Sequence, residues 1–135
     1  MSSTIQEISS WWSNSEEREH TKVAEALLEC GANAKLLDQS RRTPLHLASE
    51  HGYLDVAQRL LDRGADAHAQ DKHNVTPLHL ASQKGRLKVV QLLLSCSVDP
   101  NTRGENDQTA LHLALGHAPR YVFYVLIYVD GELIP

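Results

Sequence analysis

Apolar residues recur along this chain in blocks that lie 33 positions apart. Within the block at 56–61, valine, alanine and two leucines fall at the spacing that places side chains on one face of a helix. The same register returns at 89–94 and 122–127, and it extends backwards to 23–28. A fixed period of this length predicts stacked repeat units, because one unit is too small to bury its own apolar face.

A four-residue motif precedes three of these blocks. It reads Thr-Pro-Leu-His at 43–46 and 76–79 and Thr-Ala-Leu-His at 109–112, so consecutive copies start 33 residues apart (76 − 43 and 109 − 76). Threonine is a good helix N-cap, and proline fits the first helical position because its missing N–H is not needed there. We therefore expect a first helix to start directly after Thr43. Its predicted apolar face consists of Leu45, Leu47 and Ala48.

The remainder of a unit predicts a second helix and a projecting loop. Gly52 ends the first helix, and a second helix is expected from about Leu54 to Asp62. Gly64 then supplies the left-handed residue with which many helices end. The polar stretch 65–75 contains turn-forming residues and is expected to be an extended loop or hairpin. Each unit is thus predicted to be helix, turn, helix and hairpin.

The repeated motif, the leucine pairs and the Gly-Ala-Asp step at 64–66 resemble the ankyrin repeat family over about residues 20–130. The resemblance implies an all-α solenoid of about four stacked units, whose hairpins project at right angles to the helix pairs. The expected divisions are 1–37 as a degenerate N-terminal capping repeat, 38–70 and 71–103 as ankyrin repeats, and 104–135 as a C-terminal repeat with an atypical apolar second helix.

Four positions at which the family has glycine carry other residues here. The loop tips have Arg41, Asn74 and Asp107, and the end of one second helix has Ser97. Asparagine and aspartate tolerate the left-handed backbone conformation, whereas arginine does so poorly. The first loop tip is therefore expected to be strained or differently shaped.

Both ends of the chain depart from the repeat pattern. Trp11 and Trp12 stand where the motif proline and leucine belong, and either a capping unit or one longer helix over 16–29 fits the sequence. Residues 121–129 are apolar or aromatic at every position, whereas a terminal amphipathic helix has a polar stripe. Three explanations stay open: the array continues into further repeats, the segment is an interface, or it pairs as a strand. Self-association through a C-terminal helix would use Tyr121, Tyr124, Ile127 and Tyr128.

Charge is unevenly distributed along the chain. The net charge is −4, which argues against nucleic acid as a partner. Residues 71–103 carry five Lys and Arg against two Asp, a net charge of +3 (5 − 2), and they lie between acidic ends. A basic middle unit favours a protein partner with an acidic segment, because their potentials are complementary.

Two features indicate an intracellular protein, cytoplasmic or nuclear, and a third argues against a membrane span. The chain starts with neither a basic nor an apolar signal segment. The apolar run at 121–129 is too short for a membrane span, which needs about 20 residues. Cys30 and Cys96 occupy equivalent positions two periods apart, too far for a disulfide, and unpaired thiols are typical of a reducing compartment.

The eight histidines do not predict a metal or catalytic site. His46, His79 and His112 belong to the motif, where an imidazole can bond the threonine hydroxyl and a backbone group. His68 and His73 flank one hairpin, but no cysteine or carboxylate set completes a metal site. No phosphate-binding loop or nucleophile motif is present. We therefore predict no catalytic residue, no metal, no cofactor and no enzymatic activity.

The expected function is reversible protein binding, as a scaffold or an inhibitor. In the ankyrin family, hairpin tips and first helices line a concave groove that binds proteins. By that resemblance, the expected partner-binding residues are Gln39, Ser40, Arg42, Glu50, His51 and Tyr53 in one unit, and Lys72, His73, Val75, Gln83, Lys84 and Arg86 in the next. Tyr53 and Arg86 are the strongest of these by residue type. The alternative function is a structural segment of a larger ankyrin-repeat protein with no separate ligand.

The resemblance also implies a modification site. Ankyrin hairpins can be hydroxylated at an asparagine that follows the second helix, and Asn101 occupies the matching place.

Overall fold

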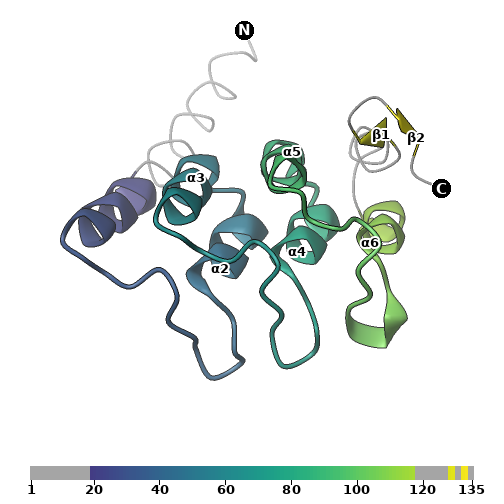
Figure 1. Ribbon diagram of the computed structural model, residues 1–135, viewed down its shortest axis with the longest axis horizontal. Coiled ribbons are helices and arrows are strands. Elements are labelled where there is room, and N and C mark those ends of the chain that lie inside the picture. Colours follow the sequence, from purple (N-terminus) through teal and green to yellow (C-terminus); the bar gives the residue numbers. More distant parts are fainter. Residues whose placement is uncertain (1–18, 118–127, 130–131, 134–135) are drawn as a thin grey trace, which may run out of the picture. The chain divides into compact units, whose positions relative to one another are not determined.

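The computed structural model describes residues 19–117, 128–129 and 132–133. After a first helix over residues 19–29, the elements are α2 (Pro44–His51), α3 (Leu54–Asp62), α4 (Pro77–Gln83), α5 (Leu87–Ser95), the 3₁₀ turn η1 (Glu105–Asp107), α6 (Ala110–His117), β1 (Tyr128–Val129) and β2 (Glu132–Leu133) (Figure 1). The helix pair predicted for residues 43–75 is confirmed, and α3 has the predicted bounds.

The chain divides into two compact units, one up to Asn33 and one from Ala34 onwards. The helix at 19–29 belongs to the first unit, and its Leu28 is buried. The choice between a capping unit and one longer helix depends on residues before position 19. Trp11 and Trp12 lie outside the described residues, so both alternatives stay predictions.

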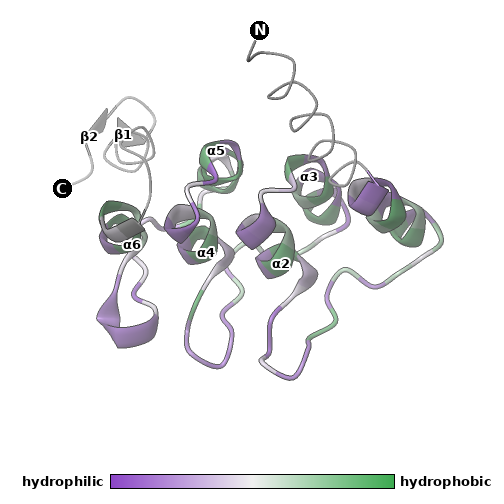
Figure 2. Cartoon of the chain, turned by 180° about the vertical axis from the view of Figure 1, so that it is seen from behind, coloured by the Kyte–Doolittle hydropathy of each residue, from purple (hydrophilic) through white to green (hydrophobic). Residues whose placement is uncertain are grey.

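The helices of the second unit form two layers. Helices α2, α4 and α6 pack side by side in the layer next to the loops, and α3 packs against α5 in the other layer (Figure 1). Each first helix also contacts the second helix of its own repeat, α2 with α3 and α4 with α5. The loops project away from the first helices, and their tips are mainly polar (Figure 2). The predicted all-α repeat solenoid is confirmed for this part of the chain.

The threonines of the motif start their helices as predicted. The side-chain oxygen of Thr43 accepts the backbone N–H of His46, and the imidazole of His46 accepts the backbone N–H of Thr43. Thr76 and His79 form the same reciprocal capping pair at α4. Each pair satisfies two backbone donors that a helix start otherwise leaves without a partner.

Leucines at repeated positions fill the core between the layers. At most 2 % of the surface is exposed in Leu45, Leu60, Leu78 and Leu93. The prediction that Leu47 joins this core is wrong, since Leu47 is 43 % exposed. Its equivalent Leu80 is only 5 % exposed, because α4 lies between α2 and α6. Within the second unit, α2 has a described neighbour in its layer on one side only.

All four positions at which the resemblance implies glycine, three at loop tips and one after α5, have a left-handed backbone. The backbone angle φ is 61° at Arg41, 64° at Asn74, 59° at Asp107 and 62° at Ser97. Because Arg41 has the same conformation as Asn74, the expectation of a differently shaped first tip is wrong. The expectation of strain stands, since a residue with a Cβ pays about 1 kcal/mol or more in this region.

The third loop has a different tip. Gly104 occupies the position held by Asp38 and Asp71 in the preceding loops, and η1 follows it. A Cβ at Gly104 would lie only 3.1 Å from Cε1 of His79. A side chain at position 104 would therefore require His79 or the loop backbone to shift by a few tenths of an ångström.

A short antiparallel strand pair lies near the C-terminus. Tyr128 is paired with Leu133 and Val129 with Glu132. Tyr128 therefore lies in a strand and not in a helix. The three explanations for the segment 121–129 as a whole stay predictions. Tyr121, Tyr124 and Ile127 lie outside the described residues, and their part in an interface stays a prediction.

Candidate functional site

Two motif histidines, His46 and His79, connect their helices to the next loop. Nε2 of His46 donates to the carbonyl oxygen of Val75 at 2.8 Å, and Nε2 of His79 donates to that of Thr102 at 2.9 Å. Nδ1 of each ring then acts as an acceptor, which requires the neutral imidazole. Burial lowers the pKa of both histidines below the ordinary value of 6.5 and so favours that form. The predicted structural role of these histidines is confirmed, and it includes a bond to the following repeat.

Buried Asp71 fixes the tip of the second loop. Its Oδ1 accepts the backbone N–H groups of His73 at 2.8 Å and Val75 at 3.0 Å. Burial alone would raise the pKa of this carboxyl, but these two bonds and Arg42 hold the pKa below its ordinary value. Asp38, one period earlier, accepts from Ser40 and Arg42 in the same way. The equal spacing of these two aspartates was a signal that the sequence-based site assignment did not use.

Arg42 joins the first loop to the second. Its Nε lies 3.3 Å from Oδ2 of Asp71, and one terminal nitrogen lies 3.4 Å from Oε2 of Glu50 on α2. The backbone N–H of Lys72 donates to the carbonyl oxygen of Ser40 at 3.1 Å, which adds a second link between the two tips. Neighbouring loops are therefore held to one another by specific polar contacts.

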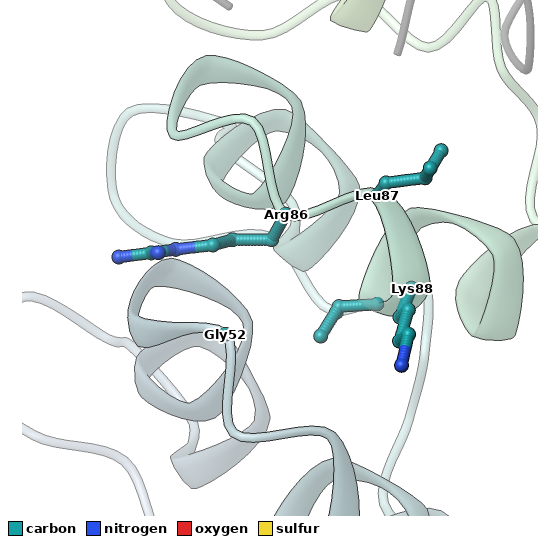
Figure 3. A pocket seen from close by; sticks show the side chains of 5 residues that line it. Gly52, Arg86, Leu87 and Lys88 are labelled. Atoms are coloured by element: carbon teal, nitrogen blue, oxygen red, sulfur yellow. The ribbon is translucent and has the colours of Figure 1, made fainter. Parts of the chain in front are cut away.

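The turns between paired helices are also fixed by specific contacts. The rings of His51 and Tyr53 stack with their centroids 5.5 Å apart. Arg86 lies across the turn at Gly52, and its Nε donates to the carbonyl oxygen of Glu50 at 3.1 Å (Figure 3). A Cβ at Gly52 would approach Cδ of Arg86 to 2.7 Å, so glycine makes room for this arginine.

The residues expected to bind a partner differ in how far they are already engaged within the chain. Arg42, Glu50 and Arg86 are held by the contacts above. The side chains of Gln39, Lys72, His73 and Lys84 are exposed and have no hydrogen bond or ion pair with the described residues. We name the surface formed by the loop tips, the exposed parts of α2 and α4 and the turns that follow these two helices the loop–helix surface. Its members from the sequence-based set are Gln39, Ser40, Arg42, Glu50, His51, Tyr53, Lys72, His73, Val75, Gln83, Lys84 and Arg86.

Other candidate chemistry is sparse in the described part of the chain. Asn101 is exposed, and its backbone N–H donates to Asp99 at 2.8 Å. Cys30 and Cys96 are free thiols. Across residues 19–117 and the strand pair, no three or more His, Cys, Asp or Glu side chains are grouped so that they could hold a metal ion. No helix among these residues has the length and apolar character needed to cross a membrane.

Residues 45–94 match the sequence profile of the family described as ankyrin repeats (many copies). Residues 45–94 therefore consist of ankyrin repeats, and over these residues the resemblance stated from the motifs is confirmed. Ankyrin repeats are general protein–protein interaction modules, and the family is typically not enzymatic. No curated protein matches the chain.

Proposed function

We propose that this chain is a non-enzymatic intracellular module that binds a partner protein through the loop–helix surface, as a scaffold or an inhibitor. The observation that carries the proposal is that exposed polar side chains lie on a loop whose backbone is held by hydrogen bonds. Lys72 and His73 flank the turn held by Asp71, and His46 fixes the carbonyl at Val75. A surface ordered before binding loses less conformational entropy when a partner docks.

Charge supports a partner with an acidic segment. Lys72 and Lys84 are exposed on the repeat with a net charge of +3, at the loop tip and at the end of α4. Neither lysine forms an ion pair with a described residue. Complementary charge on a partner would increase the association rate and fix its orientation.

The test is affinity capture from cells with two alanine variants. The first replaces Lys72, His73 and Lys84, whose exposed side chains form no hydrogen bond or ion pair with a described residue. The second replaces three exposed residues of α3 and α5, namely Gln58, Asp62 and Gln91. A protein recovered by the wild type and the second variant but lost by the first supports the proposal.

Two outcomes contradict it. Equal recovery by both variants would place the partner elsewhere on the chain. If no protein is enriched over an unrelated repeat array, the chain acts as a structural segment of a larger ankyrin-repeat protein. Circular dichroism of both variants must show unchanged helix content and melting temperature, so that lost binding is not caused by unfolding.

A further inference from the structure

A hollow lies beside the turn that connects α4 to α5. It has a volume of about 420 Å³ and a mostly apolar lining. The lining residues are Gly52, Arg86, Leu87, Lys88 and Val89. This volume falls within the range of about 300–1,000 Å³ that is typical of ligand sites in proteins. Leu87, Lys88 and Val89 belong to α5, which is outside the loop–helix surface.

Two cations line this hollow, Arg86 and Lys88. A third, Lys84, ends α4 two positions before Arg86, and all three are exposed. Lys84 and Lys88 form no ion pair with a described residue, and the first turn of α5 has no acidic side chain. Of the two carboxylates in residues 71–103, Asp71 is paired with Arg42 and Asp99 accepts a backbone N–H. The positive charge at the hollow is therefore not neutralised within its own repeat.

The arginine at the hollow is held in place. Its Nε bond to the carbonyl of Glu50 and its path across Gly52 orient the guanidinium (Figure 3). The remaining guanidinium N–H groups are available to a ligand, because arginine has five donors and this contact uses one. A positioned guanidinium binds a carboxylate with two parallel hydrogen bonds at a lower entropic cost than a mobile side chain.

The equivalent turn of the preceding repeat lacks this chemistry. One period earlier, the positions equivalent to the three cations hold His51, Tyr53 and Asp55. Asp55 is exposed in the first turn of α3 and would repel an anionic ligand at that turn. The basic hollow is thus a feature of the repeat at 71–103 and not a consequence of the fold.

We propose that the hollow binds an acidic segment of a protein, with carboxylates on Arg86 and Lys88 and an apolar side chain against the lining. This deepens the proposed function, on which it rests, because it extends the binding surface from the first helices to the start of α5. Carboxylates of the segment would neutralise the positive charge at the hollow. An apolar side chain between them would bury its surface against the apolar lining.

The test titrates the full chain, labelled with ¹⁵N, with a short fluorescein-labelled peptide in which glutamates flank one leucine. A twin peptide with glutamines in place of glutamates is the ligand control. We expect amide shifts at Gly52 and residues 84–89 with the acidic peptide only. Fluorescence anisotropy should show about tenfold weaker binding for Lys88→Glu, which corresponds to about 1.4 kcal/mol. Arg103→Glu makes the same change in net charge on an exposed loop residue and should leave the affinity unchanged.

Three results would overturn the proposal. If Lys88→Glu and Arg103→Glu weaken peptide binding equally, the peptide responds to the net charge of the protein and not to the hollow. Shifts at the loop tips near Lys72 and His73 would place the acidic segment on the loop–helix surface, so that the hollow is rejected while the proposed function stands. If neither peptide binds, the hollow is rejected, and the capture experiment with the loop-tip alanines still decides the proposed function separately.

Discussion

Arg42 and Asp71 form a contact between successive loops, with Nε of the arginine 3.3 Å from Oδ2 of the aspartate. Only 1 % of the Asp71 side chain is exposed, whereas Arg42 is 30 % exposed. The pair therefore secures a buried carboxylate that also organises the second loop tip. Arg42 belongs to the residues expected to bind a partner, but its geometry gives it a part in joining the repeats.

Replacing Arg42 should destabilise the fold as well as change the surface. We expect Arg42→Ala to lower the free energy of unfolding by about 1–3 kcal/mol, because a buried carboxylate loses its charged partner. Urea unfolding followed by circular dichroism measures this change. Arg103→Ala, at an exposed arginine of the third loop, is the control and should stay within about 0.5 kcal/mol of the wild type. Equal stability of the two variants would show that the contact contributes nothing.

The difference between Arg42 and Lys84 shows what the sequence could predict. The period of 33, the capping threonines and the glycine after α2 are local signals, so the helix bounds and the family were predictable. Which surface residues are already engaged depends on contacts between repeats. Arg42 meets a residue 29 positions away, and Arg86 meets one 36 positions away. In the sequence, Arg42, Arg86 and Lys84 all looked like free surface cations. Of these three, only Lys84 has no hydrogen bond or ion pair from its side chain to a described residue.

Leu47 illustrates a second limit of the periodic pattern. Its spacing is that of Leu80, but the exposure of the two residues differs because they have different neighbours in the layer. A repeat pattern predicts which positions face the neighbouring repeats. A side chain at such a position is buried only where a neighbouring helix lies on that side. The pattern at 121–129 was equally unable to distinguish a helix from a strand, because every position is apolar.

Two buried serines should be replaceable with a gain in stability. Ser49 and Ser82 lie one period apart, are 0 % exposed, and their hydroxyl groups have no hydrogen-bond partner in the structure. A buried unsatisfied hydroxyl costs about 1–3 kcal/mol, so Ser49→Ala and Ser82→Ala should each raise the free energy of unfolding. Alanine also has the higher helix propensity. Urea unfolding measures both variants.

The matched control for these serines adds the hydroxyl instead of removing it. Ala81 is 0 % exposed and lies next to Ser82 on α4, so Ala81→Ser should destabilise the protein. A stability loss in Ser49→Ala or Ser82→Ala would show that the hydroxyl has a partner, such as a bound water.

Glycine should relieve the strain at two left-handed residues. Arg41 and Ser97 have φ of 61° and 62°, and both are exposed. We expect Arg41→Gly and Ser97→Gly each to stabilise the fold by up to about 1 kcal/mol, because glycine has no Cβ to clash in this region. Thermal unfolding of both variants measures the gain. Gln39→Gly, on the same loop but without positive φ, should give no stabilisation, and a comparable gain there would refute the strain argument.

The buried motif histidines should make stability depend on pH. The pKa of His46 and of His79 is lowered in the folded chain, because burial disfavours the imidazolium form. As the pH falls below the ordinary value of 6.5, the unfolded chain binds protons before the folded chain does. The stabilising contribution is therefore fully present above this pH and is lost as the pH falls through it towards the lowered folded-state pKa. The lowered pKa of Asp71 acts only at more acidic pH, below 3.8.

Unfolding in urea at a series of pH values from about 5 to 8 tests this dependence, with a loss of at most about 1.4 kcal/mol per pH unit for each histidine. The double variant His46→Gln, His79→Gln should be less stable at neutral pH and should have a shallower slope, because glutamine does not titrate. Leu93→Val, which removes a buried methylene without changing a titratable group, should lower stability at every pH by a similar amount and keep the slope. If the double variant keeps the wild-type slope, other groups cause the pH dependence, and the two imidazoles do not couple protonation to the packing of the repeats.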